Sequence, residues 1–539
     1  MLEGCVPWPE DIAARYREQG IWRGDTLGTV LREAARRYGE RTALVHGERR
    51  ISYAELDRWA DRLAAGFAAH GLRAGDRIVV QLPNVPEFVA IAFGLTRLGA
   101  KLVFSLPAHR ATELVHLVEL SGAVGFLVPE SHRGHDHREL ARQVKAETTT
   151  LETLFVLGAK TEGFVSVAEL ETAVPDPRPL PEPDASDVAF FLLSGGTTAL
   201  PKLIPRTHDD YVYMSGRAAA VCELAEDDVY LAVLPIEFNF AFGCPGLLGT
   251  FLTGGTAVLA DTPNPLDCFP LIEKHGVTVT AMVPSIMTLW LEAAEWSGED
   301  LSTLRLVQVG GARMTREFTE RIQPVLGARL QQVFGMAEGL LTFSRPDDPA
   351  DAVLTTQGRP VSDADEVLIL GEDGTPLPPG GIGELVTRGP YTLRGYYRVP
   401  EYNRRAFTPD GFFRTGDLAR LTEDGDLVIE GRIKETIIRG GDKIAAGEVE
   451  DLLLTHPDIA AAAVIGVPDE FLGERICAFL VAGGPEPALA DLKQAVHARG
   501  VADYKLPDLV HYLPELPLTP LGKVDKKALA RHAASEQEG

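Results

Sequence analysis

The chain has 539 residues, enough for about three to four domains of average size. With 52 Lys and Arg against 77 Asp and Glu, its formal charge is −25, which argues against binding nucleic acid or an anionic membrane through a basic surface. Hydrophobic residues make up 45% and charged residues 24% of the sequence, so a disordered or fibrous protein is excluded for most of its length.

The five cysteines are far apart and form no C-x-x-C pair: Cys5, Cys222, Cys244, Cys268 and Cys477. This spacing argues against a zinc site or a disulfide scaffold and fits a reducing compartment. The first twenty residues lack a basic segment followed by an apolar core, so no signal peptide is expected. We therefore expect a cytoplasmic protein.

The first hundred residues alternate between helical and strand patterns. Helical spacing of apolar residues covers 27–38, 53–70 and 85–98, and short apolar strands cover 42–45, 51–53 and 77–81. Strands that alternate with helices are typical of an α/β fold with largely parallel sheets.

A cluster of histidines lies within residues 127–140. His132, His135, Asp136 and His137 are close in sequence, but Arg133 lies among them, Arg138 follows, and their spacing fits no standard zinc motif. We expect a solvated loop rather than a metal site.

Later segments predict a connector, a buried strand and a β-rich region. The connector is the Pro- and Asp-rich segment 173–187, and the buried strand is 188–193. Residues 238–260 carry no charge and are long enough to span a bilayer, but they include Asn239, Pro245 and several glycines. We expect them to form buried core and pocket wall. Short strands with Gly, Pro and Asp turns predict a β-rich subdomain over 362–430, and a mixed α/β pattern returns from about residue 434.

A loop rich in serine, glycine and threonine follows the strand at 188–193. It contains Ser194, Gly195, Gly196, Thr197 and Thr198, and Lys202 follows shortly after. Backbone N–H groups, hydroxyls and a lysine suit the oxygens of a phosphate. The spacing is not that of a Walker A loop, and the alternative interpretation is a plain flexible turn.

Four further motifs carry candidate groups. Glu338, at the end of FGMAE, is a carboxylate after a tight turn and suits a magnesium ion beside phosphates. Asp417 ends the segment DGFFRTGD and suits a ribose diol. The remaining two motifs are GRIKETIIRGG at 431–441 and LTPLGKVDKK at 518–527.

These motifs, in this order, resemble those of the adenylate-forming superfamily, which contains acyl- and aryl-CoA synthetases, adenylation domains of non-ribosomal peptide synthetases, and luciferases. The resemblance covers nearly the whole chain. Residues 4–27, 201–211 and 331–340 are similar to the stand-alone aryl-acid adenylating enzymes, including the 2,3-dihydroxybenzoate- and salicylate-AMP ligases of siderophore pathways. The resemblance implies a large N-terminal α/β domain with a β-rich subdomain over 1–433, and a small mobile α+β C-terminal domain over 434–539.

The resemblance also implies roles for single residues. Loop 194–198 and Lys202 would hold the β- and γ-phosphates of ATP, with Ala199 standing where the family usually has glycine, and Glu338 would bind Mg²⁺. Asp417 would hold the ribose with help from Arg432. Lys434 would be the hinge between the domains, and Lys523 would be the catalytic lysine that reaches the substrate carboxylate and the α-phosphate. The adenine slot would be formed by Gly311, Ala312, Arg313, Val333, Phe334 and Gly335.

The implied reaction needs no general base, because an aryl carboxylate is already ionised near neutral pH. Attack on the α-phosphorus needs charge neutralisation and in-line positioning, which Lys523, Lys202 and Mg²⁺ would supply. The aryl-AMP then passes to a phosphopantetheine thiol, after a domain rotation that brings the loop at 440–441 towards the thiol tunnel. Carrier protein and coenzyme A both remain open as the acceptor. Because no phosphopantetheine attachment motif follows, a carrier would act in trans.

The acyl pocket is implied by residues 234–245, which align with the family's LP-x-x-HN segment. Asn239 resembles the asparagine that hydrogen-bonds the ortho-hydroxyl of the acid, and Phe238 replaces the usual histidine. Cys244 and Leu341 stand where dihydroxybenzoate enzymes carry Ser and Val, which favours salicylate because a thiol pairs weakly with a 3-hydroxyl. The expected substrate-binding residues are Phe238, Asn239, Phe240, Cys244, Gly311 and Leu341.

Glu237 and the phenylalanines beside it are unusual in this segment. We expect Glu237 to point to solvent. The alternative is that these residues accommodate a modified ring, such as a methylsalicylate, a 3-hydroxyanthranilate or a 3-hydroxypicolinate.

We therefore expect ATP-dependent activation of a salicylate-like 2-hydroxyaryl acid, followed by transfer to a thiol, in siderophore or other secondary-metabolite biosynthesis. One alternative is a ligase that releases aryl-CoA. The other is a non-catalytic nucleotide-binding homologue, against which the intact set of Lys202, Glu338, Asp417, Arg432 and Lys523 argues. We expect no nucleic-acid or membrane partner, and nothing in the sequence indicates an oligomeric state.

Overall fold

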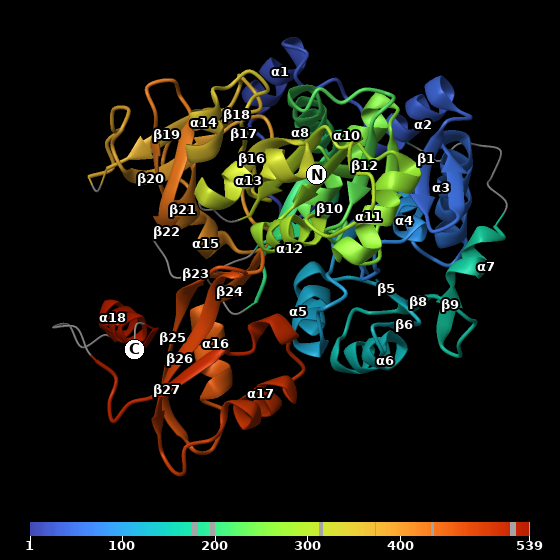
Figure 1. Cartoon of the computed structure of the whole chain (residues 1–539). Coiled ribbons are helices and arrows are strands. Elements are labelled where there is room, and N and C mark those ends of the chain that lie inside the picture. The colour runs from blue at the N-terminus through green and yellow to red at the C-terminus, as the bar shows by residue number, and fades with distance from the viewer. Residues whose placement is uncertain are drawn as a thin grey trace.

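The computed structural model describes residues 1–173, 182–194, 200–311, 316–371, 373–432, 436–517 and 524–537 (Figure 1). Two large sheets and a four-stranded sheet form the N-terminal part, and a five-stranded sheet forms the C-terminal part. This arrangement confirms the expected α/β class, with a large N-terminal domain and a small C-terminal domain.

The nine-stranded sheet is parallel in its centre and antiparallel at its edges. β1, β13, β12, β14, β15 and β16 pair in parallel, whereas β2, β17 and β18 add antiparallel strands. In sheet order its strands are β18 (Arg359–Pro360), β17 (Leu341–Phe343), β16 (Arg329–Gly335), β15 (Leu306–Gly310), β14 (Val279–Met282), β12 (Val229–Ala232), β13 (Thr256–Leu259), β1 (Thr42–His46) and β2 (Arg49–Ser52).

The seven-stranded sheet is parallel except for β11, which pairs antiparallel with β10. In sheet order its strands are β11 (Leu203–Thr207), β10 (Val188–Leu193), β4 (Lys101–Phe104), β3 (Arg77–Val80), β5 (Gly125–Pro129), β8 (Thr153–Leu157) and β9 (Phe164–Ser166). The buried strand expected at 188–193 is therefore confirmed as β10.

The two large sheets share one layer of helices, and each carries further helices on its other face. Alternate residues of β1 show this, because Leu44 packs into the shared core and Val45 into the core on the opposite side. In β3, likewise, Ile78 faces the shared core and Val79 the other side. The shared layer holds α2 (Leu27–Tyr38), α3 (Tyr53–Ala69), α4 (Pro86–Leu98), α8 (His208–Val221) and α10 (Gly246–Thr253).

The outer helices cover the remaining sheet faces. On the nine-stranded sheet they are α11 (Pro265–His275), α12 (Pro284–Ala294) and α13 (Arg316–Leu326), and on the seven-stranded sheet they are α5 (Ala111–Ser121) and α6 (His137–Glu147). Shorter or peripheral helices are α1 (Glu10–Glu18), α7 (Val167–Glu171), α9 (Asn239–Gly243), α14 (Ala350–Thr355) and α15 (Pro400–Ala406).

The helices expected near the N-terminus begin where their capping residues predict. Thr26 and Ser52 each cap a helix with a reciprocal side-chain bond three residues on, so α2 starts at Leu27 and α3 at Tyr53. Every helix and strand expected over residues 27–98 is present, with ends that agree to within two residues.

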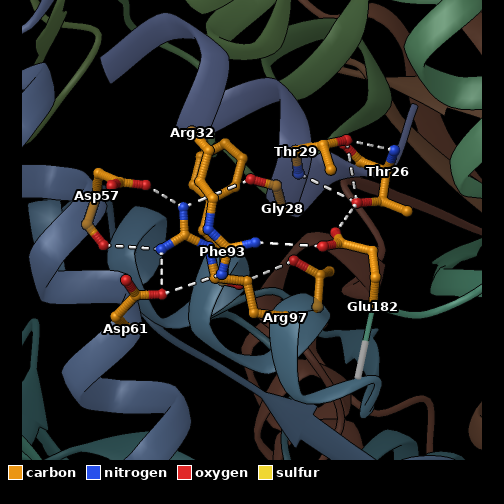
Figure 2. Close-up of polar contacts among 10 residues, drawn as sticks. Thr26, Gly28, Thr29, Arg32, Asp57, Asp61, Phe93, Arg97 and Glu182 are labelled. Carbon is orange, nitrogen blue, oxygen red and sulfur yellow. Dashed lines mark hydrogen bonds and ion pairs between the residues drawn. The ribbon is translucent and has the colours of Figure 1, made fainter. Parts of the chain in front are cut away.

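A buried arginine ties three of these helices together (Figure 2). The Arg97 guanidinium on α4 donates to the Asp61 carboxylate at 2.7 Å and to the Asp57 carbonyl at 2.8 Å, both on α3. It also pairs with the Asp57 carboxylate and reaches the Gly28 carbonyl of α2 at 3.4 Å. Its side chain is almost fully buried, so these contacts replace the water that the charge has lost.

The expectation of a solvated loop at the histidine cluster is wrong. The cluster forms a hairpin of β6 (Ser131–His132) and β7 (His135–Asp136) and runs directly into α6. His137 is fully buried, and its Nδ1 lies 3.2 Å from the Gln81 side-chain oxygen. Burial lowers the pKa of His137 to about 4. Among the described residues, no group of three or more His, Cys, Asp or Glu is arranged to hold a metal ion.

The uncharged stretch 238–260 folds as buried core and pocket wall, as expected. It forms α9, α10 and β13, and α10 lies between the two large sheets. In the part of the chain that the structure describes, no helix is long and apolar enough to cross a membrane.

The predicted β-rich subdomain is an antiparallel four-stranded sheet. Its strands are β19 (Glu366–Leu370), β20 (Gly383–Arg388), β21 (Phe413–Leu421) and β22 (Leu427–Arg432).

The C-terminal domain packs helices on both faces of its sheet. α16 and α17 cover one face and α18 the other. Its elements are β23 (Thr436–Arg439), β24 (Asp442–Ala445), α16 (Ala446–Leu453), β25 (Ile459–Asp469), β26 (Gly473–Ala482), α17 (Leu489–His497), β27 (Leu509–Tyr512) and α18 (Lys526–Gln537).

Candidate active site between the two domains

A cavity of about 700 Å³ lies where the parallel strands of both large sheets end. Its wall begins directly after β10 with Ser194, after β14 with Val283 and after β15 with Gly311. Carboxyl ends of parallel strands leave loops and unpaired backbone groups at one edge, which is where α/β proteins bind ligands. On the other side the C-terminal domain closes the cavity with Gly440 and Gly441.

Most of the described site residues predicted from the sequence meet at this cavity. Lys202, Phe334 and Asp417 are described but are not part of its wall. The predicted residues that line it are Ser194, Phe238, Asn239, Phe240, Cys244, Gly311, Val333, Gly335, Glu338 and Leu341.

Several predicted residues lie outside the described part of the chain: Gly195, Gly196, Thr197, Thr198, Ala199, Ala312, Arg313, Lys434 and Lys523. Their roles stay predictions. Arg432 is described as part of β22, and it pairs directly across from Asp417 of β21 in the ladder. The structure therefore brings the backbones of this predicted pair together on neighbouring strands, and Asp417, which is 3% exposed, is not part of the cavity wall.

Backbone hydrogen bonds close the base of the serine- and glycine-rich loop. The Ser194 N–H donates to the Lys202 carbonyl at 2.9 Å, and the Lys202 N–H donates to the Ser194 hydroxyl at 3.1 Å. These bonds continue the pairing of β10 with β11 and bring both ends of the loop to the edge of the sheet. The loop is therefore anchored where a phosphate-binding segment is needed.

Two tyrosines connect Lys202 with Glu338. The Lys202 ammonium lies 4.2 Å from the centre of the Tyr402 ring and 5.3 Å from that of Tyr396. The Tyr396 hydroxyl donates to Glu338 Oε1 at 2.8 Å. Tyr396 therefore contacts both Lys202, the expected phosphate-binding lysine, and Glu338, the expected metal-binding carboxylate. Sequence reasoning gave Tyr396 and Tyr402 no role.

Glu338 fits a magnesium ligand by chemistry and position. Its half-buried carboxylate lines the cavity, and the Leu393 N–H fixes its carbonyl at 2.7 Å. A carboxylate oxygen is the type of ligand that Mg²⁺ prefers. Nearby glycines keep the wall open, because a Cβ on Gly335 would lie 2.6 Å from Leu341 Cδ2, and Gly311 has a φ of +91°.

At the acyl end, Asn239 is held by a buried network. Its Oδ1 accepts from the Tyr211 hydroxyl at 2.9 Å, and its Nδ2 reaches the Met336 carbonyl at 3.5 Å. The guanidinium of Arg206 lies 4.8 Å from the centre of the Tyr211 ring and donates to the Ala337 carbonyl at 3.1 Å. Arg206 and Tyr211 lie within the segment 201–211, but their roles as supports were not predicted.

Cys244 and Leu341 complete the apolar part of this wall. Each is 1% exposed. Burial raises the pKa of the Cys244 thiol to about 12, so it is neutral and a weak hydrogen-bond partner. That these residues disfavour a second ring hydroxyl stays a prediction.

The expectation that Glu237 points to solvent is wrong. Its side chain is 4% exposed and it lines the cavity. Neither carboxyl oxygen has a hydrogen-bond partner among the described residues. Burial raises the pKa of Glu237 to about 8, opposed only by its own backbone N–H. A glutamate in an LP-x-x-x-N segment carries no local signal of burial, because only the fold brings it into the cavity wall.

Comparison with known protein families identifies this architecture. The chain matches the family described as AMP-binding enzyme over residues 31–397, and the AMP-binding enzyme C-terminal domain over 448–523. The chain belongs to the AMP-binding enzyme family. The resemblance to adenylate-forming enzymes, expected from the motifs, is confirmed.

Relatives of this AMP-binding enzyme include aryl-acid ligases. It is 48% identical to the 2,3-dihydroxybenzoate-AMP ligase of Bacillus subtilis, over 100% of this chain and 99% of the relative. It is also 48% identical to the salicyl-AMP ligase / salicyl-S-ArCP synthetase of Mycobacterium tuberculosis, over 98% and 94%. Among solved structures, Mycobacterium smegmatis MbtA in its apo form is 47% identical, with a TM-score of 0.77 and 98% of each chain covered.

Proposed function

We propose that the protein activates a 2-hydroxyaryl carboxylic acid with ATP, forming the aryl-AMP and pyrophosphate, and then transfers the aryl group to a phosphopantetheine thiol. The observation that carries this proposal is the acyl wall, where Asn239 is fixed by Tyr211 next to Cys244 and Leu341. A fixed amide suits a ring hydroxyl, and the rest of the wall suits an apolar ring.

The residues then have distinct tasks. Asn239 orients the acid through its ortho-hydroxyl, so that the carboxylate faces the anchored loop at 194–202. Glu338 would hold Mg²⁺, and Lys202 would lie against the phosphates. When bound, ATP supplies the adenylyl group, and Mg²⁺ offsets the charge of its phosphates. Because the acid enters ionised, no side chain has to remove a proton.

Lys523 and the hinge complete the proposal. Lys523 would steady the carboxylate and the α-phosphate during adenylation. A boundary at 433/434, with Lys434 as hinge, would let the C-terminal domain rotate between the two steps. The acceptor is a carrier protein in trans or coenzyme A. The relationship to a salicyl-S-ArCP synthetase supports the carrier protein.

The decisive experiment is Mg²⁺-dependent ATP–pyrophosphate exchange with salicylate, 2,3-dihydroxybenzoate, 6-methylsalicylate and benzoate. We expect exchange with the 2-hydroxy acids and little with benzoate, since benzoate leaves Asn239 without its ring hydroxyl. Absence of exchange with every aryl acid would refute the proposed function.

The role of Lys523 has its own test. Lys523→Ala is expected to abolish exchange while leaving thioester formation from supplied aryl-AMP largely intact, because the lysine acts only in the first step. The control is Lys160→Ala, which removes an exposed lysine paired with Glu169. Equal loss of both steps in Lys523→Ala would contradict the assigned role.

A further inference from the structure

Glu237 is a buried acid at the substrate cavity that the protein leaves without a partner. It follows β12 in the segment that also supplies Phe238, Asn239 and Phe240 to the cavity wall. Its side chain is 4% exposed, and both carboxyl oxygens have almost no accessible surface. No other described residue donates to or accepts from either oxygen.

A buried carboxyl group without a hydrogen-bond partner lowers the stability of the fold unless a ligand pairs with it. A buried polar atom without a hydrogen bond loses its hydration and gains nothing in return, and nearly all buried polar atoms in proteins are paired. An apolar residue of similar size would fill the same space without this loss. The position of Glu237 beside a substrate cavity therefore points to a partner that arrives with the ligand.

The polar group next along the cavity wall does not pair with this acid. Asn239 bonds to Tyr211 and to the Met336 carbonyl and makes no hydrogen bond to Glu237. Among the described residues no cation neutralises Glu237, and only its own backbone N–H favours the ionised form. The missing partner is thus a group that accepts from the O–H of the neutral acid or donates to its carbonyl oxygen, and a nitrogen on the ligand can do either.

We propose that Glu237 is a specificity-determining residue that pairs with a basic nitrogen on the aryl acid, either an amino substituent or a ring nitrogen. This inference rests on the proposed function and narrows its substrate class. The glutamate side chain turns about its torsions from the wall towards the bound ring. A nitrogen there receives the acid's hydrogen bond or its proton, whereas the C–H edge of salicylate leaves the acid unpaired.

The test compares matched acids by ATP–pyrophosphate exchange. The panel is salicylate, 4-aminosalicylate, 5-aminosalicylate, 3-hydroxyanthranilate and 3-hydroxypicolinate. For the unmodified enzyme we expect kcat/KM for the best nitrogen-bearing acid to exceed that for salicylate at least ten-fold. Glu237→Met should reduce this ratio at least ten-fold, because methionine keeps the size of the side chain but offers no hydrogen bond. Glu237→Gln should give an intermediate ratio.

Several outcomes separate this inference from the proposed function. If Glu237→Met and Glu237→Gln leave the ratio within two-fold of the unmodified enzyme, Glu237 does not contact the ring and the inference is overturned. It is also overturned if salicylate is the best acid of the unmodified enzyme. If no aryl acid exchanges at all, the proposed function fails first, and the inference fails with it.

Two controls exclude a general effect of substitution. Glu273→Met, on an exposed position of α11, should leave the ratio unchanged. Thermal unfolding should show that Glu237→Met is at least as stable as the unmodified enzyme, since it removes an unpaired buried acid. A merely structural role for Glu237 predicts a lower Tm and an unchanged ratio.

Discussion

The part of the cavity wall around Asn239 is supported by side chains that do not line the cavity themselves. Tyr211 is fully buried between the two large sheets, and its hydroxyl fixes Asn239 Oδ1. The close fit needs a glycine nearby, because a Cβ on Gly243 would lie 2.5 Å from that hydroxyl. Arg206 supports the tyrosine ring and the turn before Glu338 together. We therefore assign Tyr211 as a positioning residue for the amide.

Tyr211→Phe should weaken recognition of the ortho-hydroxyl. The change keeps the ring but leaves Asn239 Oδ1 without its donor, so the amide can turn. We expect kcat/KM for 2-hydroxyaryl acids in ATP–pyrophosphate exchange to fall about ten-fold, corresponding to about 1–2 kcal/mol for one buried hydrogen bond. The discrimination against benzoate should fall with it. Tyr213→Phe on the same helix is the matched control, because its hydroxyl bonds to Ser362 instead. A similar loss in both variants would contradict the assignment.

The residues near the site differ in whether a local sequence motif can predict their role. Asn239, Cys244, Leu341 and Glu338 stand in motifs whose spacing can be recognised, and the structure places all four on one cavity. Tyr396 could not be assigned a role, because its partner Glu338 is 58 positions away and only the fold joins them. Glu237 was misjudged for the same reason: a charged residue looks exposed until the elements that bury it are known.

At the level of helices and strands, local sequence was sufficient where periodicity and capping agree. α2, α3 and α4 were predicted to within two residues, since apolar spacing sets their buried faces and Ser52 or Thr26 marks a start. The prediction for the histidine cluster was wrong because His137 is buried against Gln81, which directly follows β3 and is far away in the sequence. The contacts that join the three helices, through Arg97, were equally beyond sequence reasoning.

Arg97→Met should destabilise this helical layer. The substitution keeps apolar bulk but leaves Asp57 without its cation and Asp61 with only its longer contact to Arg32 at 3.4 Å. We expect a loss of about 2–4 kcal/mol, less than for a fully buried pair because both carboxylates are partly exposed. The measurement is the midpoint of the first urea transition, since a protein of this size need not unfold in one step. Arg36→Met, which removes an exposed pair with Glu33, should change the midpoint little. Equal shifts in both variants would refute the role of the cluster.

At the scale of the whole molecule, buried contacts hold the C-terminal domain in one orientation relative to the large domain. Lys505 of the C-terminal domain lies 2.8 Å from Glu113 of α5 and 2.8 Å from Glu448 of α16, and all three are buried. Burial opposes the charge on Lys505, but the two carboxylates together raise its pKa. In this orientation Gly441 lies against Val283, where a Cβ would come within 2.9 Å of Val283 Cγ1, and it lines the same cavity as Asn239. The 440–441 loop therefore lies at the cavity, which is the arrangement that the proposed thioester-forming step requires.

Lys505→Met should uncouple the two half-reactions. It removes the cation that holds Glu113 and Glu448 together, so the docked orientation loses its central contact and leaves two buried carboxylates in mutual repulsion. The proposed rotation gives adenylation another orientation, so ATP–pyrophosphate exchange should stay within about three-fold of the unmodified enzyme. Transfer from preformed aryl-AMP to the thiol acceptor, measured in a single turnover, should slow at least ten-fold, since about 1.4 kcal/mol of lost docking energy is a factor of ten.

Glu113→Gln should show the same pattern more weakly, because the Glu448 contact remains. Lys274→Met, which breaks an exposed pair with Glu48 inside the large domain, should slow neither step. If Lys505→Met slows both steps equally, the buried triad stabilises the fold without selecting an orientation.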